Sequence, residues 1–269
     1  MFSFVKGLFT DTYKQSEQES RDVILTGNGK ADFKVMVICI TVAFSIVMVR
    51  YFGDTFFTLS FLESIGATQL YLKLGHLFLK SEGRQLYSLL WWVSLILVFY
   101  LAVPVIIIKC WFKERLTDYG VKLKGAFKDY WLYIVMLLIM LPLVFHFSKT
   151  VSFQERYPFY KPATGEPLFP RFIVWEVFYF LHFLAVEFFF RGFMVHGTKK
   201  RFGYYSVFVM MIPYCMVHFG KPFPETMAAI VAGLVLGTLS LKSRSIMLGV
   251  AIHYSVAITM DMFALWYIR

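Results

Sequence analysis

The segment Ala185–Gly197, AVEFFFRGFMVHG, places a carboxylate and a guanidinium inside a strongly apolar stretch. A charged side chain at mid-membrane costs about 2.5–3.5 kcal/mol on insertion scales, so an ionisable residue within a membrane span is by default a candidate for function. Glu187 and Arg191 are four residues apart, which puts them on one face of a helix, where they could also simply neutralise each other. The choice between these interpretations depends on the rest of the chain.

The composition around this segment is that of a polytopic membrane protein. Of the 269 residues, 58% are hydrophobic and only 16% are charged, and the mean hydropathy of +0.63 lies outside the usual range for a soluble domain. Apolar runs recur along nearly the whole length, which leaves no room for a sizeable soluble domain. We therefore predict an all-α fold, a bundle of seven to eight transmembrane helices in a lipid bilayer.

A helical span needs about 20 mainly apolar residues, or somewhat fewer where neighbouring helices cover it, and seven segments meet this requirement. They are approximately Phe33–Phe52, Leu86–Ile108, Tyr130–Phe147, Phe172–Met194, Tyr204–His218, Thr226–Leu241 and Ile246–Ile268. Charged residues interrupt Phe56–Leu79, which is either an eighth span or a surface helix. Residues 1–32 are expected to form a cytoplasmic or interfacial N-terminal segment, and residues 33–269 the transmembrane domain. The apolar residues that share one helical face near the N-terminus suit a helix on the membrane surface: Phe2, Val5 and Phe9.

The formal charge of +10 is explained by membrane topology rather than by nucleic acid. Many lysines and arginines lie in loops between spans, where the positive-inside rule expects them. The most basic loop, residues 109–128, is assigned to the cytoplasm, and alternation then places Thr198–Arg201 and Leu241–Ser245 on the same side. The N-terminus is cytoplasmic if Phe56–Leu79 does not cross. We predict no nucleic-acid partner.

Ionisable residues within the predicted spans are concentrated in the second half of the chain. They are Glu176, His182, Glu187, Arg191, His218 and His253. At about 1.5 Å per helical residue, the distance from the cytoplasmic end of the span is roughly 16 Å for Glu187, 21 Å for His218 and 12 Å for His253. These three side chains can therefore converge near the middle of a hydrocarbon core about 30 Å thick.

A glutamate and two histidines in a water-poor pocket have the chemistry of a general-base site. The carboxylate and one histidine can take a proton from water, and the second histidine can donate a hydrogen bond to the oxyanion formed when water attacks an amide. Arg191 would orient the carboxylate. The same ligands could bind zinc, but their spacing matches no zinc motif such as HExxH. We rank zinc second and predict neither a metal nor another cofactor.

At these residues the chain resembles the family of CAAX prenyl endopeptidases and bacteriocin-processing proteins, also called CPBP or Abi, which are glutamic-type intramembrane proteases. That family carries Glu-Glu-x-x-x-Arg, Phe-x-x-x-His and His-x-x-x-Asn motifs on its core helices. The similar segments here are VEFFFR at Val186–Arg191, YCMVH at Tyr214–His218 and HYSVA at His253–Ala257. The likeness covers about residues 116–269, where we expect a CPBP-like core.

The resemblance implies a substrate, a location and a set of catalytic residues. The implied partner is a membrane-anchored or lipidated peptide or protein that is cleaved at a peptide bond. We expect an integral protein of the bacterial cytoplasmic membrane with a cytoplasmic N-terminus. The implied catalytic residues are Glu187, Arg191, His218 and His253.

Two positions depart from the family motifs. Val186 replaces the first glutamate, which is usually credited with activating water. Adjacent helical residues point about 100° apart, so Glu187 replaces the missing group only if the helix turns or the pocket differs. Ala257 replaces the asparagine that would polarise the scissile carbonyl, and Asp261, two turns beyond His253, is a poor geometric substitute.

Two functions therefore stay open. In the first, the chain is an intramembrane endopeptidase in which Glu187 and His218 activate water and His253 stabilises the oxyanion. In the second, it is an inactive pseudoprotease that serves as a binding, scaffold or immunity protein, with Glu187 and Arg191 as a structural ion pair. Because a scaffold has little need of two buried imidazoles at matched depth, we favour the protease.

Overall fold

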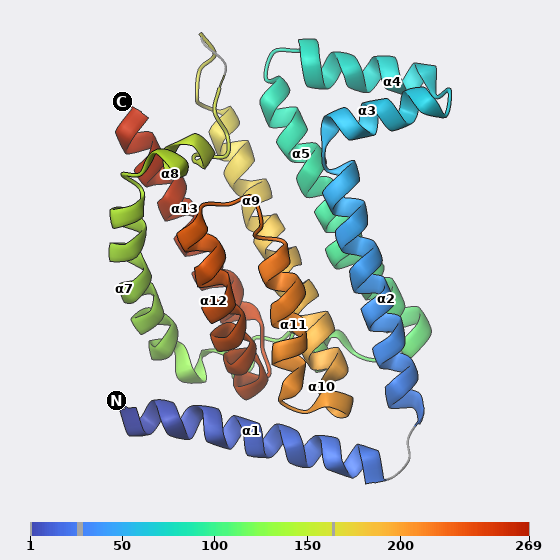
Figure 1. Cartoon of the computed structure of the whole chain (residues 1–269), viewed down its shortest axis with the longest axis vertical. Helices are drawn as coiled ribbons and strands as arrows, with labels where there is room; N and C mark the ends of the chain where they lie inside the picture. Colours follow the sequence, from blue (N-terminus) through green and yellow to red (C-terminus); the bar gives the residue numbers. More distant parts are fainter. Residues whose placement is uncertain (1, 26–28, 163–164, 269) are drawn as a thin grey trace.

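The computed structural model describes residues 2–25, 29–162 and 165–268. Every regular element within these ranges is a helix, and they contain no β-strand, which confirms the all-α class. Most of the long helices run between the two ends of one bundle, short helices lie across one end, and a helix of 24 residues lies across the other (Figure 1).

Within the described residues, six helices are long and apolar enough to cross a membrane. They are Asp32–Phe52, Arg84–Phe112, Tyr130–Phe147, Arg171–Phe202, Phe223–Ser243 and Met247–Tyr267. The predicted span Tyr204–His218 is the 12-residue helix α11 (Tyr205–Met216), which is apolar but short of the length of a full span. The chain is an integral membrane protein, and the predicted seven to eight spans reduce to six full-length helices and α11.

Four of the six spans are single α-helices, and two contain π-helical segments. The uninterrupted ones are α2 (Gly29–Phe52), α7 (Tyr130–Phe147), α12 (Phe223–Ser243) and α13 (Met247–Ile268). The second span runs through α5 (Arg84–Ile96), η2 (Leu97–Ala102), α6 (Val103–Ile106) and η3 (Ile107–Phe112). The fourth runs through α9 (Arg171–Glu187), η6 (Phe188–His196) and α10 (Gly197–Phe202) and is the most buried of the six, so it forms the centre of the bundle.

The segment that the sequence left undecided, Phe56–Leu79, forms short helices that lie across one end of the bundle (Figure 1). They are α3 (Thr55–Ser64), α4 (Thr68–Gly75) and the π-helical turn η1 (His76–Lys80). The Asp54 carboxylate accepts the N–H groups of Phe56 and Phe57, which starts a new helix directly after α2. Gly66 then adopts φ = 71° and separates α3 from α4. The structure therefore has the surface alternative, and α2 and α5 are consecutive spans.

The basic segments assigned to one side of the membrane lie together at the opposite end. Helix α1 (Phe2–Leu25) lies across this end and contacts α10 (Figure 1). Arg244 pairs with Glu19 of α1 at 3.0 Å, and the Ser245 hydroxyl donates to the Lys122 carbonyl at 2.7 Å. The three basic segments therefore share one face of the molecule, as the charge pattern predicts.

Three expectations about this end stay predictions. The first is that it faces the cytoplasm, and the second is the division of the chain at residue 32. The third concerns the apolar face near the N-terminus. The structure describes the helix at these residues but not their side chains: Phe2, Val5 and Phe9.

The other end of the bundle is closed by the loop that follows helix α8 (Val151–Arg156). Tyr157 and Tyr160 are buried, and the Phe159 ring stacks on Trp92 with centroids 5.9 Å apart. The Asp261 carboxylate of α13 accepts the Phe159 N–H at 3.3 Å and the Trp175 indole N–H at 3.2 Å. Asp261 thus ties the loop to α9 and α13.

Candidate active site

The candidate site is built on the central helix, where α9 continues into the π-helical segment η6. All nine residues of η6 are buried. Glu187 is the last residue of α9, and Arg191 lies within η6. π-Helical segments are frequent at functional sites, and their wider turns change which residues share a face.

One oxygen of Glu187 contacts two partners. Oε1 lies 2.9 Å from Nη1 of Arg191 and 2.9 Å from Nδ1 of His253, which is on α13. The side chain of Glu187 is 1% exposed, that of Arg191 0% and that of His253 18%. The carboxylate is therefore fully enclosed, and His253 is the member of the group that reaches the surface of the site.

The other oxygen of Glu187 has no hydrogen-bond partner within the described part of the chain. This Oε2 atom lies against Gly249, where a Cβ atom would be only 2.6 Å away. A glycine at this position lets α13 approach the carboxylate closely, because any side chain would displace it. No motif in the sequence points to Gly249, and only its place one helical turn before His253 links it to the site.

Arg191 is held by more than its ion pair. Its guanidinium lies 4.0 Å from the centroid of the Tyr214 ring of α11, and Nη2 donates to the Ala232 carbonyl of α12 at 3.4 Å. A cation on an aromatic face gains most when both are withdrawn from water. Arg191 therefore links three helices around the carboxylate.

His218 joins the group through Tyr214. Its Nδ1 lies 2.7 Å from the Tyr214 carbonyl oxygen, and its ring centroid lies 4.7 Å from that of Tyr214. The His253 ring lies 6.3 Å from the same Tyr214 ring. The two imidazoles thus share one aromatic neighbour, although the contacts of the described residues include no hydrogen bond between His218 and Glu187. The sequence marked Tyr214 only as a replacement for the motif phenylalanine.

Part of the chain that contains this arrangement is similar to a known protease family. Residues 168–259 match the Rce1-like family model. Its description is type II CAAX prenyl endopeptidase Rce1-like, a family of intramembrane proteases. The Rce1-like segment contains Glu187, Arg191, His218 and His253, and it begins later than the predicted core at residue 116. No curated protein and no solved structure matches the chain significantly.

The two residues that depart from the family motifs, Val186 and Ala257, are both buried within the Rce1-like segment. Val186 belongs to the main hydrophobic cluster, so the position of the first motif glutamate carries no polar atom. Ala257 packs in a separate cluster that includes Tyr179 and Phe183. Asp261 is engaged with Trp175 and the loop, which leaves it as a structural anchor away from Glu187.

Other ionisable groups of the Rce1-like segment do not join Glu187. The His182 ring packs 4.8 Å from the ring of Trp92, and its Nδ1 has no partner among the described residues. Glu176 accepts the hydroxyl of Tyr254 at 3.1 Å. The Phe183 ring separates His182 from His253, with centroids 4.9 Å and 4.5 Å from them respectively.

The geometry also bears on the zinc alternative. Among the described residues, no group of three His, Cys, Asp or Glu side chains is placed to hold one metal ion. Glu187 and His253 supply two suitable donors, and no third donor of the described residues is placed with them. The residues present therefore do not fit a zinc site in this arrangement.

Proposed function

We propose that the chain is an intramembrane endopeptidase that hydrolyses a peptide bond of a membrane-associated or lipidated substrate with water activated by a Glu/His pair. The observation that carries the proposal is the contact of Glu187 Oε1 with His253 Nδ1 at 2.9 Å. A carboxylate that holds one ring nitrogen of a histidine prepares the other nitrogen for general-base catalysis. The Rce1-like match over this segment supports the same reaction class.

In the proposed mechanism His253 is the base. Its Nδ1–H donates to Glu187, so Nε2 carries the lone pair of the neutral ring. A water at Nε2 loses a proton to the ring as its oxygen attacks the scissile carbonyl carbon, and the Glu187 carboxylate stabilises the imidazolium. The imidazolium then gives this proton to the amine nitrogen as the C–N bond breaks, which releases the amine and restores neutral His253.

His218 is the second imidazole of the proposed site. Its Nδ1–H donates to the Tyr214 carbonyl, so its Nε2 can accept a hydrogen bond from the water or from a substrate N–H. Arg191 acts through Glu187, because its charge keeps the carboxylate ionised and oriented toward His253. This proposal changes the roles that the sequence suggested for the two histidines: His253 takes the proton from water in place of His218, and His218 positions the water instead of His253 stabilising the oxyanion.

A second candidate function is a binding, scaffold or immunity protein without hydrolytic activity. The complete burial of Glu187 and Arg191 favours it, because two enclosed charges can serve as a structural ion pair. The apolar residues Val186 and Ala257 at the departing motif positions favour it too.

A cleavage assay separates the two functions. The protein is purified in detergent and incubated with a library of membrane-tethered peptides that includes prenylated CAAX peptides, and products are identified by mass spectrometry. We expect cleavage by the wild type and a rate about 10²–10⁴-fold lower for His253→Ala and Glu187→Gln. The exposed residues His146 and Glu63 supply matched controls, since His146→Ala and Glu63→Gln should keep the wild-type rate.

Cleavage at the wild-type rate by both His253→Ala and Glu187→Gln would move the reaction away from this site. A folded wild type that cleaves nothing in the library would favour the scaffold function.

A further inference from the structure

A cavity of about 430 Å³ lies far from the candidate active site, at the end of the bundle crossed by α3 and α4. Phe56 of α3, Phe78 and Leu79 of η1, and Arg84, Gln85 and Ser88 of α5 line it, together with Glu166. The α2 span ends at Phe52 and the next span begins at Arg84. The cavity therefore lies at the level where the hydrocarbon core gives way to lipid headgroups.

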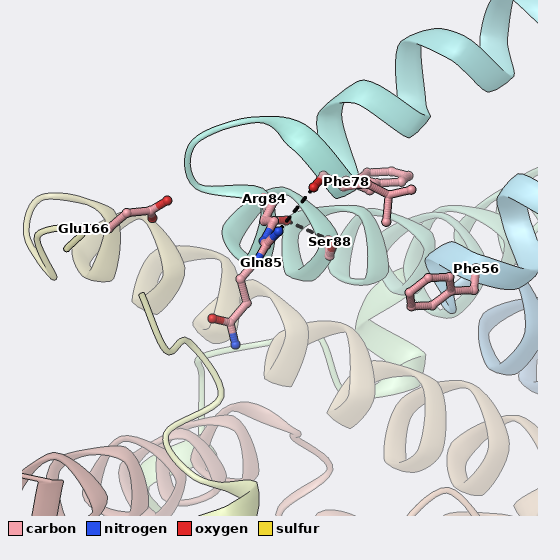
Figure 2. Close-up of a pocket in the computed structure, with 7 residues that line it drawn as sticks. Phe56, Phe78, Arg84, Gln85, Ser88 and Glu166 are labelled. Carbon is pink, nitrogen blue, oxygen red and sulfur yellow. Dashed lines mark hydrogen bonds between the residues drawn. The ribbon is translucent and has the colours of Figure 1, made fainter. Parts of the chain in front are cut away.

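The two sides of this cavity differ in chemistry. Figure 2 shows Arg84 between Glu166 on one side and Phe56 and Phe78 on the other. Phe56 is 69% exposed, whereas Phe78 is buried and packs on Trp91 with ring centroids 5.8 Å apart. The apolar side is thus a fixed aromatic wall with an open outer edge.

On the polar side, the carboxylates of Glu166 and Glu82 both pair with Arg171 and not with Arg84. Both oxygens of Glu166 are engaged, since Oε1 accepts the Gly83 N–H at 3.0 Å and Oε2 pairs with Arg171 at 2.8 Å. Arg84 is exposed, and within the described part of the chain its guanidinium donates only to the Leu79 carbonyl, at 3.3 Å. No carboxylate of the described residues lies within ion-pair distance of Arg84. The cavity therefore presents a free guanidinium beside an apolar wall.

We propose that this cavity binds a glycerophospholipid of the surrounding bilayer, with its phosphate on Arg84 and an acyl chain along Phe56 and Leu79. A guanidinium binds phosphate through charge-assisted hydrogen bonds, often with two N–H groups at once. The volume suits a headgroup and its glycerol, and the exposed edge at Phe56 lets the chains leave toward the membrane. The bound lipid joins α3 to the start of α5.

The test measures binding of phosphatidylglycerol to the delipidated, detergent-solubilised protein by native mass spectrometry. We expect phosphatidylglycerol to bind Arg84→Gln about tenfold more weakly than the wild type, because one charge-assisted contact is lost. Its binding to Phe56→Ala should also be weaker than to the wild type. Diacylglycerol, which lacks the phosphate, should bind the wild type at least about tenfold more weakly for the same reason. The control is Arg50→Gln, which removes an exposed cation at the end of α2 outside the cavity.

Equal lipid affinity of Arg84→Gln and the wild type, or an equal loss in Arg50→Gln, would overturn the proposal. Competition by millimolar inorganic phosphate would also overturn it, because the site would then bind a free anion rather than a lipid. Thermal unfolding of each variant without lipid shows whether it is folded, and Phe56→Ala, at an exposed position, provides a second variant if Arg84→Gln is not.

Discussion

Replacing Glu187 by glutamine keeps the size of the side chain and removes its charge. Arg191 is then left fully buried without a counter-ion. Removing one partner of a buried ion pair costs about 3–5 kcal/mol of unfolding free energy. Glutamine still offers one oxygen to His253 and Arg191, so we expect about 3 kcal/mol. Arg191→Met leaves the carboxylate unpaired except for His253 and should cost a similar amount.

The double variant Glu187→Gln/Arg191→Met removes both charges together. Since neither residue is then left as an uncompensated ion, the double variant should cost about 2 kcal/mol less than the sum of the two single variants, within the range of coupling for residues in contact. The measurement is the free energy of unfolding, obtained by titrating a denaturing detergent into the purified protein and following helical circular dichroism.

The chain supplies a control pair with the same spacing. Lys221 and Glu225 are also four residues apart and lie 2.6 Å from each other, but both side chains are 20% exposed. A partly exposed pair contributes about 1 kcal/mol or less. The reasoning would be refuted if the Glu187 and Arg191 variants were additive within about 0.5 kcal/mol, or if they cost no more than Lys221→Met and Glu225→Gln.

Three further predictions concern residues around the site and at both ends of the bundle. Gly249→Ala places a Cβ atom 2.6 Å from Glu187 Oε2, so we expect peptide cleavage to fall about 10²-fold and the free energy of unfolding to fall by about 1–3 kcal/mol. Asp261→Asn keeps only one accepting oxygen for two donors and should lower the free energy of unfolding by about 1–3 kcal/mol. The measurement is an unfolding titration followed by tryptophan fluorescence. Burial opposes ionisation of Glu114, but hydrogen bonds from Lys34 and Tyr119 outweigh it and lower the pKa of this carboxyl below its ordinary value. Its stabilising contribution is therefore present above the ordinary glutamate pKa and is lost as the pH falls through the lower folded-state pKa. The difference in the free energy of unfolding between wild type and Glu114→Gln should shrink over that acidic range. A difference that does not change with pH would contradict the assignment.

Hydrophobicity and loop charge predicted the architecture because both act over whole segments. Apolar runs long enough for the bilayer became helices, and the basic segments meet at one end of the bundle. The short helix α11 escaped this rule because its apolar sequence continues past Met216 into a turn that is no longer helical. For Phe56–Leu79, the outcome depended on two local signals, the Asp54 cap and the positive φ of Gly66.

The pairing within the site could not be predicted from depth alone. Matched depth placed Glu187, His218 and His253 at one level, but the rotation of each helix decides which side chains meet. The π-helical segment after Glu187 changes that rotation, and the close approach at Gly249 selects His253 as the partner. Neither effect has a periodic pattern in the sequence, so both required the packed structure.

The unequal use of the two Glu187 oxygens bears on which of the proposed functions is favoured. A carboxylate kept only as a structural counter-ion gains most from a two-pronged pair with arginine, in which both oxygens accept N–H groups. Here Oε1 lies 2.9 Å from both Arg191 Nη1 and His253 Nδ1, and Oε2 is buried against Gly249 without a donor among the described residues. An unsatisfied buried acceptor costs about 1–3 kcal/mol, and a catalytic role is one explanation for such a group. The one-sided arrangement places Oε1 beside His253, which favours hydrolysis over a scaffold.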